Sequence, residues 1–413
     1  MDKPRIRFKG YTDAWEQRKL GEIVERVTRK NQDLVSTLPL TISAQYGLID
    51  QSVFFDKRVA SKDVSGYYLV KKGEFAYNKS TSSDAPWGAI KRLDRYENGV
   101  LSTLYIVFAI NENVEIDSDY LVTYHDTNLW HRGIREIAAE GARNHGLLNI
   151  APADFFKTSL SVPQDIEEQK AIGKYFTELN ALITLHQRKC DETKKLKKYM
   201  LQNMFPRNGS NVPAIRFDGF TNAWEQRKLG DICESFEYGL NAAAKEYDGK
   251  NKYIRITDID DSSHEFLQED VTSPDMDLTG AENYCLKYGD ILFTRTGASV
   301  GKTYIYKDSD GLVYYAGFLI RGRVKDEFAP EFVFQNTLTD DYEKFIRITS
   351  QRSGQPGVNA QEYAGYEISM PTYKEQKKIG QYFSNLDHLI TLHQHKCDEL
   401  VKIKKYMLQN MFV

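Results

Sequence analysis

The 413-residue sequence contains only four cysteines, Cys190, Cys233, Cys285 and Cys397, and none of them forms a CxxC pair. This number and this scatter exclude a disulfide framework and a cysteine-knuckle metal site. No apolar run approaches the length of about 20 residues that spans a bilayer. The basic start MDKPRIRFKG also lacks the apolar stretch of a signal peptide. We therefore expect a cytoplasmic protein that has no contact with a membrane.

Signatures of catalysis are missing as well. The sequence has no HExxH, no nucleophile–base constellation, no paired-carboxylate signature and no Asn-Pro-Pro-Tyr/Phe motif of amino-methyltransferases. We therefore predict a protein that is not itself an enzyme. The 55 basic and 58 acidic residues give a net charge of −3, which excludes a wholly basic surface. A local positive groove remains possible, and a partner subunit can supply phosphate contacts.

One glycine-rich stretch, TGASVGKT at Thr296–Thr303, has some features of a phosphate-binding loop. That motif requires four residues between its glycines, whereas Gly297 and Gly301 enclose three. The following YIYK indicates a strand, so no helix N-terminus would face a phosphate. We interpret the stretch as the loop of a β-hairpin. The weaker alternative is a nucleotide-hydrolysing enzyme that depends on Lys302.

What the sequence does contain is a long internal repeat. Pro4–Glu25 and Pro213–Glu234 match at 16 of 22 positions and share the phrase AWEQRKLG. Gln169–Phe205 and Gln376–Phe412 match at 27 of 37 positions. The chain is therefore two copies of one unit of roughly 200 residues. The stretch PRNGSNV, Pro206–Val212, is a plausible linker between them.

Between these ends the two copies differ in sequence, with only faint parallels. Tyr67–Ser80 and Tyr284–Gly297 each indicate two short strands around a glycine turn. Leu101–Ile110 and Tyr314–Val324 each indicate one further core strand. We therefore predict that the two middles share a fold and differ in surface.

The repeated C-terminal segments have the periodicity of amphipathic helices. Apolar or small residues recur at alternating steps of four and three, which is the pattern of a coiled-coil seam. Similar units tend to pair about a two-fold axis, so we predict that the two seams bury each other in antiparallel helices. About 40 helical residues span roughly 60 Å, with the globular middles expected at opposite ends. The seam positions are Ile172, Phe176, Leu179, Ile183, His186, Cys190 and Thr193, repeated as Ile379, Phe383, Leu386, Ile390, His393, Cys397 and Leu400.

The seams place His186 with Cys190, and His393 with Cys397, four residues apart on one helical face. If the helices cross there, four ligands suited to zinc could meet. Simple packing of these side chains is our prediction, because histidine and cysteine at a helical seam are more often packed than metal-bound.

Two loops in each middle carry side chains of the kinds that contact DNA. Arg, Lys, Asn, Gln, Ser and Thr reach phosphates and base edges, and glycines let backbone approach the strand. A solvated turn is the alternative interpretation for each loop. The candidate DNA-binding residues are Asn78, Lys79, Ser80, Thr81, Arg143, Asn144 and His145 in the first copy and Arg295, Thr296, Ser299, Lys302, Gln351, Arg352 and Gln355 in the second.

Together these features resemble the specificity subunit of a type I restriction–modification enzyme over essentially the whole chain. The resemblance rests on the duplicated WEQRKLGE/WEQRKLGD openings, the EQ-x-x-IG-x-YF helix starts and endings of the type LITLHQRKCDETKKLKKYMLQNMF. It implies two variable target-recognition domains that each read one half of a split double-stranded DNA site. It also implies that the repeated regions bind two modification (methyltransferase) subunits, which motor-nuclease restriction subunits can join. No cofactor is expected on this chain; S-adenosylmethionine, ATP and Mg²⁺ are expected on the partner subunits.

We therefore predict an α+β fold class: two globular mixed α/β target-recognition domains separated by two long antiparallel coiled-coil-like helices, arranged as a pseudo-two-fold tandem repeat. The main alternative is a scaffold whose two heads bind proteins and have no affinity for DNA. The expected segments are a repeated N-terminal segment (1–21), recognition domain 1 (22–163), a central spacer helix (164–207), a linker with the second repeated segment (208–230), recognition domain 2 (231–371) and a C-terminal spacer helix (372–413).

Overall fold

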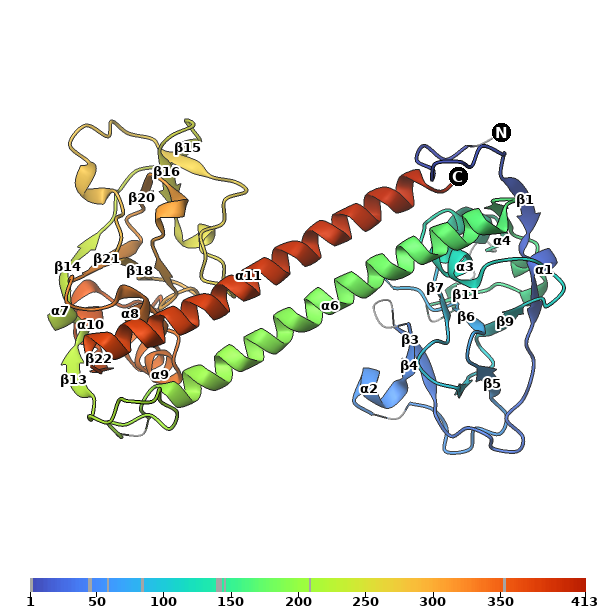
Figure 1. Ribbon diagram of the computed structural model, residues 1–413, viewed down its shortest axis with the longest axis horizontal. Coiled ribbons are helices and arrows are strands. Elements are labelled where there is room, and N and C mark those ends of the chain that lie inside the picture. Colours follow the sequence, from blue (N-terminus) through green and yellow to red (C-terminus); the bar gives the residue numbers. More distant parts are fainter. Residues whose placement is uncertain are drawn as a thin grey trace. The chain divides into compact units, whose positions relative to one another are not determined.

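The chain divides into two units, and each unit contains a piece of both repeats (Figure 1). Unit 1 comprises residues 1–185 and 397–413, and unit 2 comprises residues 186–396. The structure is a computed structural model that describes residues 3–413 except 44–46, 58, 83–84, 139–142, 145, 208 and 352–353. For Arg143 and Asn144 it describes the backbone alone. Among the described residues, no helix combines the length and the apolar character that crossing a membrane requires.

Unit 1 combines short strands with short helices. Its strands are β1 (Glu16–Lys19), β2 (Val24–Arg26), β3 (Leu40–Ser43), β4 (Gly47–Asp50), β5 (Tyr68–Lys71), β6 (Phe75–Asn78), β7 (Ala89–Arg92), β8 (Asn98–Leu101), β9 (Ile106–Ile110), β10 (Arg143–Asn144), β11 (Leu147–Leu148) and β12 (Ser159–Val162). Its helices are α1 (Leu20–Ile23), α2 (Gln51–Phe55), α3 (Ser118–His125), α4 (Trp130–Ile137), α5 (Pro152–Phe155) and the first part of α6 (Ile166–Met204). Four strands form an antiparallel sheet in the order β2–β9–β6–β7, and the other strands form the pairs β1–β12, β3–β4, β5–β8 and β10–β11.

Unit 2 has a similar composition. Its strands are β13 (Glu225–Lys228), β14 (Cys233–Tyr238), β15 (Ala244–Glu246), β16 (Lys252–Ile254), β17 (Thr272–Pro274), β18 (Asp290–Thr294), β19 (Thr303–Ile305), β20 (Val313–Tyr315), β21 (Leu319–Val324) and β22 (Glu367–Met370). Its helices are α7 (Leu229–Ile232), α8 (Pro330–Asn336), α9 (Asp340–Thr349), α10 (Ala360–Ala364) and most of α11 (Tyr373–Asn410), with 3-10 turns at Ile256–Asp258, Glu282–Tyr284 and Asp308–Asp310. The sheets run β14–β21–β18–β19, β15–β17–β16–β20 and β13–β22.

The two units share one frame. In each, the repeated EQRK strand pairs antiparallel with the strand that precedes the long helix, β1 with β12 and β13 with β22. The sheet orders β2–β9–β6–β7 and β14–β21–β18–β19 correspond strand for strand. The predicted α+β fold with two sheet-rich domains is therefore confirmed. The core strands predicted in Leu101–Ile110 and Tyr314–Val324 are β9 and β21.

The middles diverge outside this frame. In unit 1 the antiparallel pair β5–β8 is extended and Pro39 makes only a single parallel bridge to Val100, whereas in unit 2 the parallel pair β16–β20 is the extended one. The strand predicted at the start of Tyr284–Gly297 is wrong. Glu282–Tyr284 forms a 3-10 turn, and Cys285 makes a single bridge to Tyr314. The turn uses the backbone N–H of Cys285 for a bond to Glu282, so this segment offers no continuous ladder to β20.

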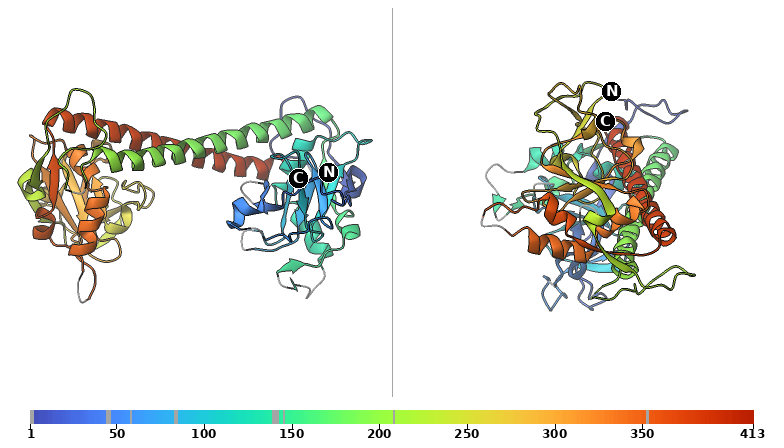
Figure 2. Two further views of the ribbon diagram at one scale, coloured as in Figure 1. Left: turned by 90° about the horizontal axis from the view of Figure 1, so that it is seen from below. Right: turned by 90° about the vertical axis from the view of Figure 1, so that its left-hand side faces the viewer.

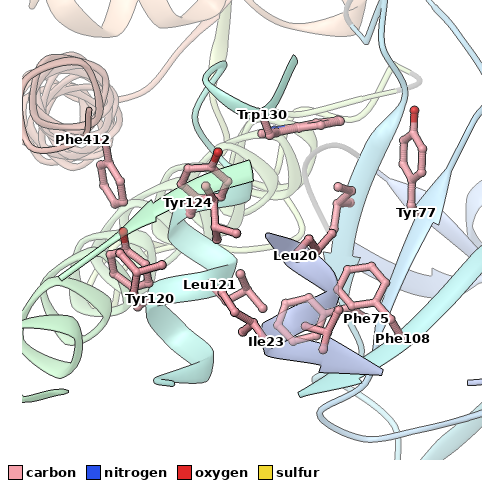
Figure 3. Close-up of a cluster of buried hydrophobic side chains, with 14 of the residues drawn as sticks. Leu20, Ile23, Phe75, Tyr77, Phe108, Tyr120, Leu121, Tyr124, Trp130 and Phe412 are labelled. Carbon is pink, nitrogen blue, oxygen red and sulfur yellow. The ribbon is translucent and has the colours of Figure 1, made fainter. Parts of the chain in front are cut away.

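The core of unit 1 lies between the sheet and its short helices (Figure 3). The rings of Phe75 and Phe108 stack with centroids 5.4 Å apart. Leu20 and Ile23, from the single turn that ends the repeated N-terminal segment, are buried in the same cluster. Trp15, Leu20 and Ile23 of AWEQRKLGEI are therefore core positions, whereas Glu16 and Gln17 between them are exposed.

A buried ion pair joins the two ends of each repeat. In unit 1 the Arg7 Nε lies 2.6 Å from Glu168 Oε1, and in unit 2 the Arg216 Nε lies 2.6 Å from Glu375 Oε1. The two glutamate side chains are 1% and 0% exposed. Removing one partner of a buried pair leaves an uncompensated charge, at a cost of about 3–5 kcal/mol. The repeated arginine and glutamate are therefore explained by folding.

The glutamine of each EQ motif fixes the start of the long helix. Gln169 accepts a hydrogen bond from the N-cap backbone of α3 and donates one to the carbonyl of Pro163, each at 2.9 Å. Gln376 makes the equivalent bonds to the N-cap of α8 at 3.0 Å and to Pro371 at 2.8 Å. The repeated EQ pair thus anchors each long helix to its globular domain.

The two long helices pack antiparallel within each unit. In unit 1, the ring centroid of Phe176 in α6 lies 6.0 Å from that of Phe412, which follows the end of α11. In unit 2, successive contacts advance along α6 and retreat along α11: His186 meets His393, Cys190 meets Ile390, and Phe205 meets Phe383. The predicted seam is therefore confirmed, while the six segment boundaries expected from sequence stay a prediction.

Candidate nucleic-acid interface

Unit 2 contains the loop Arg295–Lys302, which connects β18 to β19. The strands pair antiparallel, with Phe293 opposite Thr303, so the predicted hairpin is confirmed. A strand and no helix follows the loop, and a phosphate-binding loop needs the helix. Both glycines of the loop have positive φ, 81° at Gly297 and 88° at Gly301, a backbone conformation that side chains disfavour. The glycines therefore shape the turn.

This hairpin loop lies against the second predicted loop of unit 2. The Gly297 N–H donates to the Pro356 carbonyl at 3.0 Å, and the Val358 N–H donates to the Arg295 carbonyl at 2.9 Å. Thr296 bridges to Gly357. Two loops that were predicted separately from sequence thus form one continuous surface.

Unit 1 repeats this arrangement with different residues. The Thr81 N–H donates to the Gly146 carbonyl at 2.8 Å, and the Leu148 N–H donates to the Lys79 carbonyl at 3.0 Å. Ser80 bridges to Leu147. Lys79 therefore occupies the place that Arg295 occupies in unit 2. In unit 1 the strands β10 and β11 lie on the side of the domain away from α6 (Figure 2).

The predicted side chains of unit 2 differ in what they contact. Arg295 is half-buried, and its guanidinium carbon lies 4.9 Å from the centroid of the Tyr238 ring. Gln355 is exposed beside Gly297. Thr296 and Ser299 are half-buried, and the Ser299 carbonyl accepts a hydrogen bond from a threonine hydroxyl at the end of β18.

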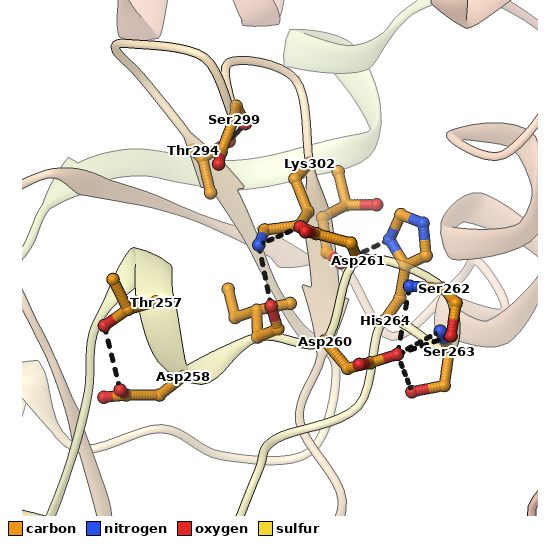
Figure 4. A network of polar contacts seen from close by, with 12 residues as sticks. Thr257, Asp258, Asp260, Asp261, Ser262, Ser263, His264, Thr294, Ser299 and Lys302 are labelled. Atoms are coloured by element: carbon orange, nitrogen blue, oxygen red, sulfur yellow. Dashed lines mark hydrogen bonds and ion pairs between the residues drawn. The ribbon is translucent and has the colours of Figure 1, made fainter. Parts of the chain in front are cut away.

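Lys302 points inward (Figure 4). Its ammonium lies 2.7 Å from the Ile259 carbonyl and 2.7 Å from Asp261 Oδ1, and its side chain is only 10% exposed. The adjacent turn is held by Asp260, which accepts hydrogen bonds from Ser262 and Ser263. These bonds lower the pKa of Asp260 to about 2, against the opposing effect of burial. The Lys302 charge is thus already neutralised within unit 2.

The predicted side chains of unit 1 hold their own loop. Asn78 accepts a hydrogen bond from the Ser80 N–H at 3.0 Å, and the Thr81 hydroxyl donates to the Gly146 carbonyl at 3.0 Å. The Lys79 ammonium lies 3.5 Å from the Ile150 carbonyl, and burial lowers the pKa of Lys79. Ser80 itself is exposed.

Several predicted residues lie beyond these observations. Arg143 and Asn144 form β10, which pairs with β11 next to the loop of Lys79, but their side chains fall outside the described residues. His145 and Arg352 also lie outside the described residues. Gln351 is exposed at the end of α9. As base or phosphate contacts, all these residues stay predictions.

Two aromatic residues at this edge of unit 2 were missed in the sequence. Tyr238 is 43% exposed at the end of β14, and Phe318 is 63% exposed just before β21. Each stands beside a glycine, in EYGL and AGFL, and an aromatic residue next to a glycine at a strand end is the signal that could have found them. Their proximity to Arg295 depends on strand order, which the sequence does not reveal.

The helical seam shows no metal cluster. The Nδ1 atoms of His186 and His393 lie 3.0 Å apart, and the Cys190 thiol faces the Ile390 carbonyl at 3.8 Å. Within the described part of the chain, no three or more His, Cys, Asp or Glu side chains are placed to hold a metal ion. The contacts of His186, His393 and Cys190 agree with packing at the seam.

Comparison with known proteins bears directly on these two units. Residues 222–402 match the family described as type I restriction modification DNA specificity domain. The resemblance to type I specificity subunits is confirmed. A Methanocaldococcus jannaschii protein named as the type I restriction enzyme MjaX specificity subunit is 26% identical over 197 residues, 46% of this chain and 45% of that protein. The MjaVIII specificity subunit of the same organism is 24% identical over 225 residues, 52% of this chain and 46% of that subunit.

The chain thus matches slightly less than half the length of these specificity subunits. A solved structure extends the likeness in fold to the whole chain. The type I restriction-modification S subunit of M. genitalium superposes with a TM-score of 0.63, covering 100% of this chain and 99% of that one, at 13% identity. At this identity the comparison establishes the fold of a specificity subunit.

Proposed function

We propose that this chain is the DNA-specificity subunit of a type I restriction–modification complex and reads an asymmetric bipartite site in double-stranded DNA. The observation that carries this proposal is that the two units have the same strand order but different residues in the corresponding loops. Lys79 and Arg295 occupy the same position in two units whose strand order is the same. Two recognition domains that share a fold but carry different side chains in their loops suit two unlike half-sites.

The chain is proposed to act without a catalytic site or cofactor of its own. Methylation and cleavage would be carried out by partner subunits, which would bind S-adenosylmethionine, ATP and Mg²⁺. Two methyltransferase subunits would dock on this chain, joined by motor-nuclease restriction subunits in the complete complex. A repeated docking surface is the feature that suits two copies of one partner.

A repeated surface that would suit this role lies on the outer faces of α6 and α11. Seven positions on each helix follow steps of three and four, and six of the seven are identical in the two helices. We call each set an outer stripe. The stripes are Leu182, Leu185, Lys189, Glu192, Leu196, Tyr199 and Asn203 on α6, and Leu389, Leu392, Lys396, Glu399, Ile403, Tyr406 and Asn410 on α11.

The outer stripes contain exposed apolar and aromatic side chains. Leu182 and Leu389 are 45% and 41% exposed, and Tyr199 and Tyr406 are 55% and 58% exposed. Apolar residues at coiled-coil spacing on a helix surface favour a partner helix. The similar exposure of Leu182 and Leu389, and of Tyr199 and Tyr406, supports docking of the same partner helix twice.

Methylome mapping tests the proposed function. Cells that carry the chain together with its methyltransferase are expected to show methylation at one bipartite motif, which cells lacking the chain do not show. DNA binding by the purified complex is expected to weaken steeply as salt rises, through counterion release. Methylation without sequence preference, or an absence of DNA affinity, would overturn the proposal, and the latter would favour the protein scaffold.

Docking is tested separately by changing the outer stripe. Leu182→Asp and Leu389→Asp each place a charge on one stripe, and each is expected to remove one methyltransferase subunit from the complex. The double variant is expected to lose both subunits, as measured by native mass spectrometry. Ser384→Asp, a partly buried polar position on α11 outside the stripe, is the control. Full occupancy in the double variant would contradict the docking surface.

A further inference from the structure

Three neighbouring strands of unit 2 bring an aromatic and a cationic residue together. Tyr238 is the last residue of β14, and Arg295 directly follows β18. β21 lies between these strands, with Ile320 opposite Tyr238 and Leu319 opposite Thr294. Because Leu319 and Ile320 are adjacent, Tyr238 and Arg295 lie at the same end of their neighbouring strands.

The Tyr238 ring forms a fixed platform for the guanidinium group. The Arg295 guanidinium carbon lies 4.9 Å from the ring centroid, within the range of a cation–π contact. The Tyr238 hydroxyl accepts a hydrogen bond from the Ala360 N–H at 3.3 Å, which holds the ring in place. Stacking restricts the orientations of a planar guanidinium, so less rotamer freedom is lost when its donors bind a ligand.

Arg295 differs from the other half-buried or buried arginines of its sheet. Arg323 pairs with Asp290 at 2.7 Å, and Arg321 is paired with Glu237. Among the described residues, no carboxylate or carbonyl contacts the Arg295 side chain. A guanidinium carries five N–H donors in a planar fork, and donors shielded from water need acceptors. The geometry at Arg295 therefore suits an acceptor that arrives with a ligand.

Resting on the proposed function, we propose that Arg295, oriented by Tyr238, reads a guanine in the half-site recognised by unit 2. Guanine presents two acceptors, O6 and N7, in the major groove, and their spacing matches the arginine fork. Gly297 lies in the same loop without a side chain, which allows close approach of the backbone to a base pair. The exposed Gln355 beside Gly297 adds a second group that reads base edges.

Unit 1 has a different group at this position. Lys79 has the same backbone bonding as Arg295, but its ammonium is a single point charge within 3.5 Å of the Ile150 carbonyl. A lysine lacks the planar fork that matches two acceptors in fixed geometry. The requirement for guanine at this position is therefore assigned to the half-site of unit 2.

The experiment compares methylation motifs written in cells by the complete complex. The unaltered complex is expected to require a guanine in one half-site. Arg295→Lys, which keeps the charge, is expected to lower discrimination at that one base pair about 5- to 150-fold. The remaining positions and the other half-site are expected to stay as they are. Arg347→Gln, which removes an exposed arginine on α9 of the same unit, is the control and is expected to leave the motif intact.

The platform is tested with a matched pair of variants. Tyr238→Leu removes the ring and is expected to relax the same base pair as Arg295→Lys does. Tyr238→Phe keeps the ring and is expected to retain the motif. In every variant, continued recognition of the unit 1 half-site shows that the complex is assembled. If the complex with Tyr238→Leu does not assemble, the result for Arg295→Lys alone decides whether Arg295 reads the guanine.

Two results would overturn the inference. Weakened methylation of all sequences alike in Arg295→Lys would mark a phosphate contact. An unchanged motif, or a half-site of unit 2 without a required guanine, would exclude base reading by Arg295. Both results leave the proposed function standing, whereas methylation without any motif in the unaltered complex would end the proposed function itself.

Discussion

The Trp15 indole and the Phe412 ring meet edge to face with their centroids 6.0 Å apart, although they lie near opposite ends of the chain. Trp224 and Phe205 meet in the same way at 6.2 Å. The tryptophan of each repeat is therefore packed by the last aromatic residue of the other repeat. Each unit is complete only when both repeats contribute to its core.

Phe412→Ala is expected to destabilise unit 1 by about 3–5 kcal/mol, because it deletes a buried ring and leaves a cavity. Phe205→Ala is expected to have the same effect on unit 2. Urea unfolding followed by hydrogen exchange with mass spectrometry would assign each loss to its unit. Tyr406→Ala, at an exposed position of α11, is expected to change stability by less than about 0.5 kcal/mol. Equal loss in both units for either variant would contradict the exchange of repeat ends.

A half-protein that ends near residue 208 is expected to form a dimer. It retains Trp15 but has lost Phe412, and the Phe205 of a second copy offers the same ring to that site. Such a dimer presents the first reader twice, so it is expected to bind a palindrome of the first half-site. Light scattering and a DNA selection would measure both properties. A strictly monomeric fragment without DNA binding would count against the pairing, and Phe205→Ala should abolish the dimer.

Exchange of residues 22–163 for the same region of a related subunit is expected to change one half of the target. The other half and the spacer between the halves are expected to remain, since the second unit and both long helices are untouched. Methylome mapping of the chimaera would read out both halves. A change in both halves, or in the spacer length, would show that the units do not read independently.

The stability of unit 1 is expected to fall between pH 6.5 and pH 4. Burial lowers the pKa of His125 to about 4, although its hydrogen bond to the Leu121 carbonyl opposes the shift. Because the folded-state pKa lies below the unfolded value of about 6.5, protons bind preferentially to the unfolded chain. The stabilisation is therefore complete above pH 6.5 and is lost as the pH falls, by up to about 3 kcal/mol.

His125→Asn tests this assignment, because asparagine binds no proton in that range. The variant is expected to show a flatter dependence of unfolding free energy on pH over the same interval. Trp130 donates a hydrogen bond to the His125 carbonyl at 3.0 Å, so its fluorescence is a local probe. An identical slope in both proteins would show that other groups cause the acid sensitivity.

The repeated stretch AWEQRKLG contains both buried residues that pack in the core and exposed residues on the surface. Trp15 and Leu20 are buried and explain why their counterparts in the second copy are the same. Glu16 and Gln17 are exposed on a two-stranded ribbon, and internal packing does not require them. Sequence comparison recognises the repeat but does not separate these two causes, since exposure depends on the partner strand β12.

The sequence by itself determined the features that depend on local periodicity. The seam of the long helices, the hairpin at Thr296–Thr303 and the core strands β9 and β21 all follow from spacing within short windows. The repeat follows from direct comparison of distant segments of the same sequence. The same reasoning placed a strand at Tyr284, where a 3-10 turn stands instead. A short apolar run gives no information about whether a neighbouring strand is available to pair with it.

Only the tertiary structure decided which side chains meet. Lys302 was a candidate for phosphate contact, yet it turns inward to Asp261, while Arg295 seven positions earlier stacks on Tyr238. The exchange of Phe205 and Phe412 between the two repeats was equally hidden in two identical NMF endings. Local spacing fixes the direction of a side chain relative to its own strand or helix. The group that it contacts is set by strand order and by packing between segments far apart in the sequence.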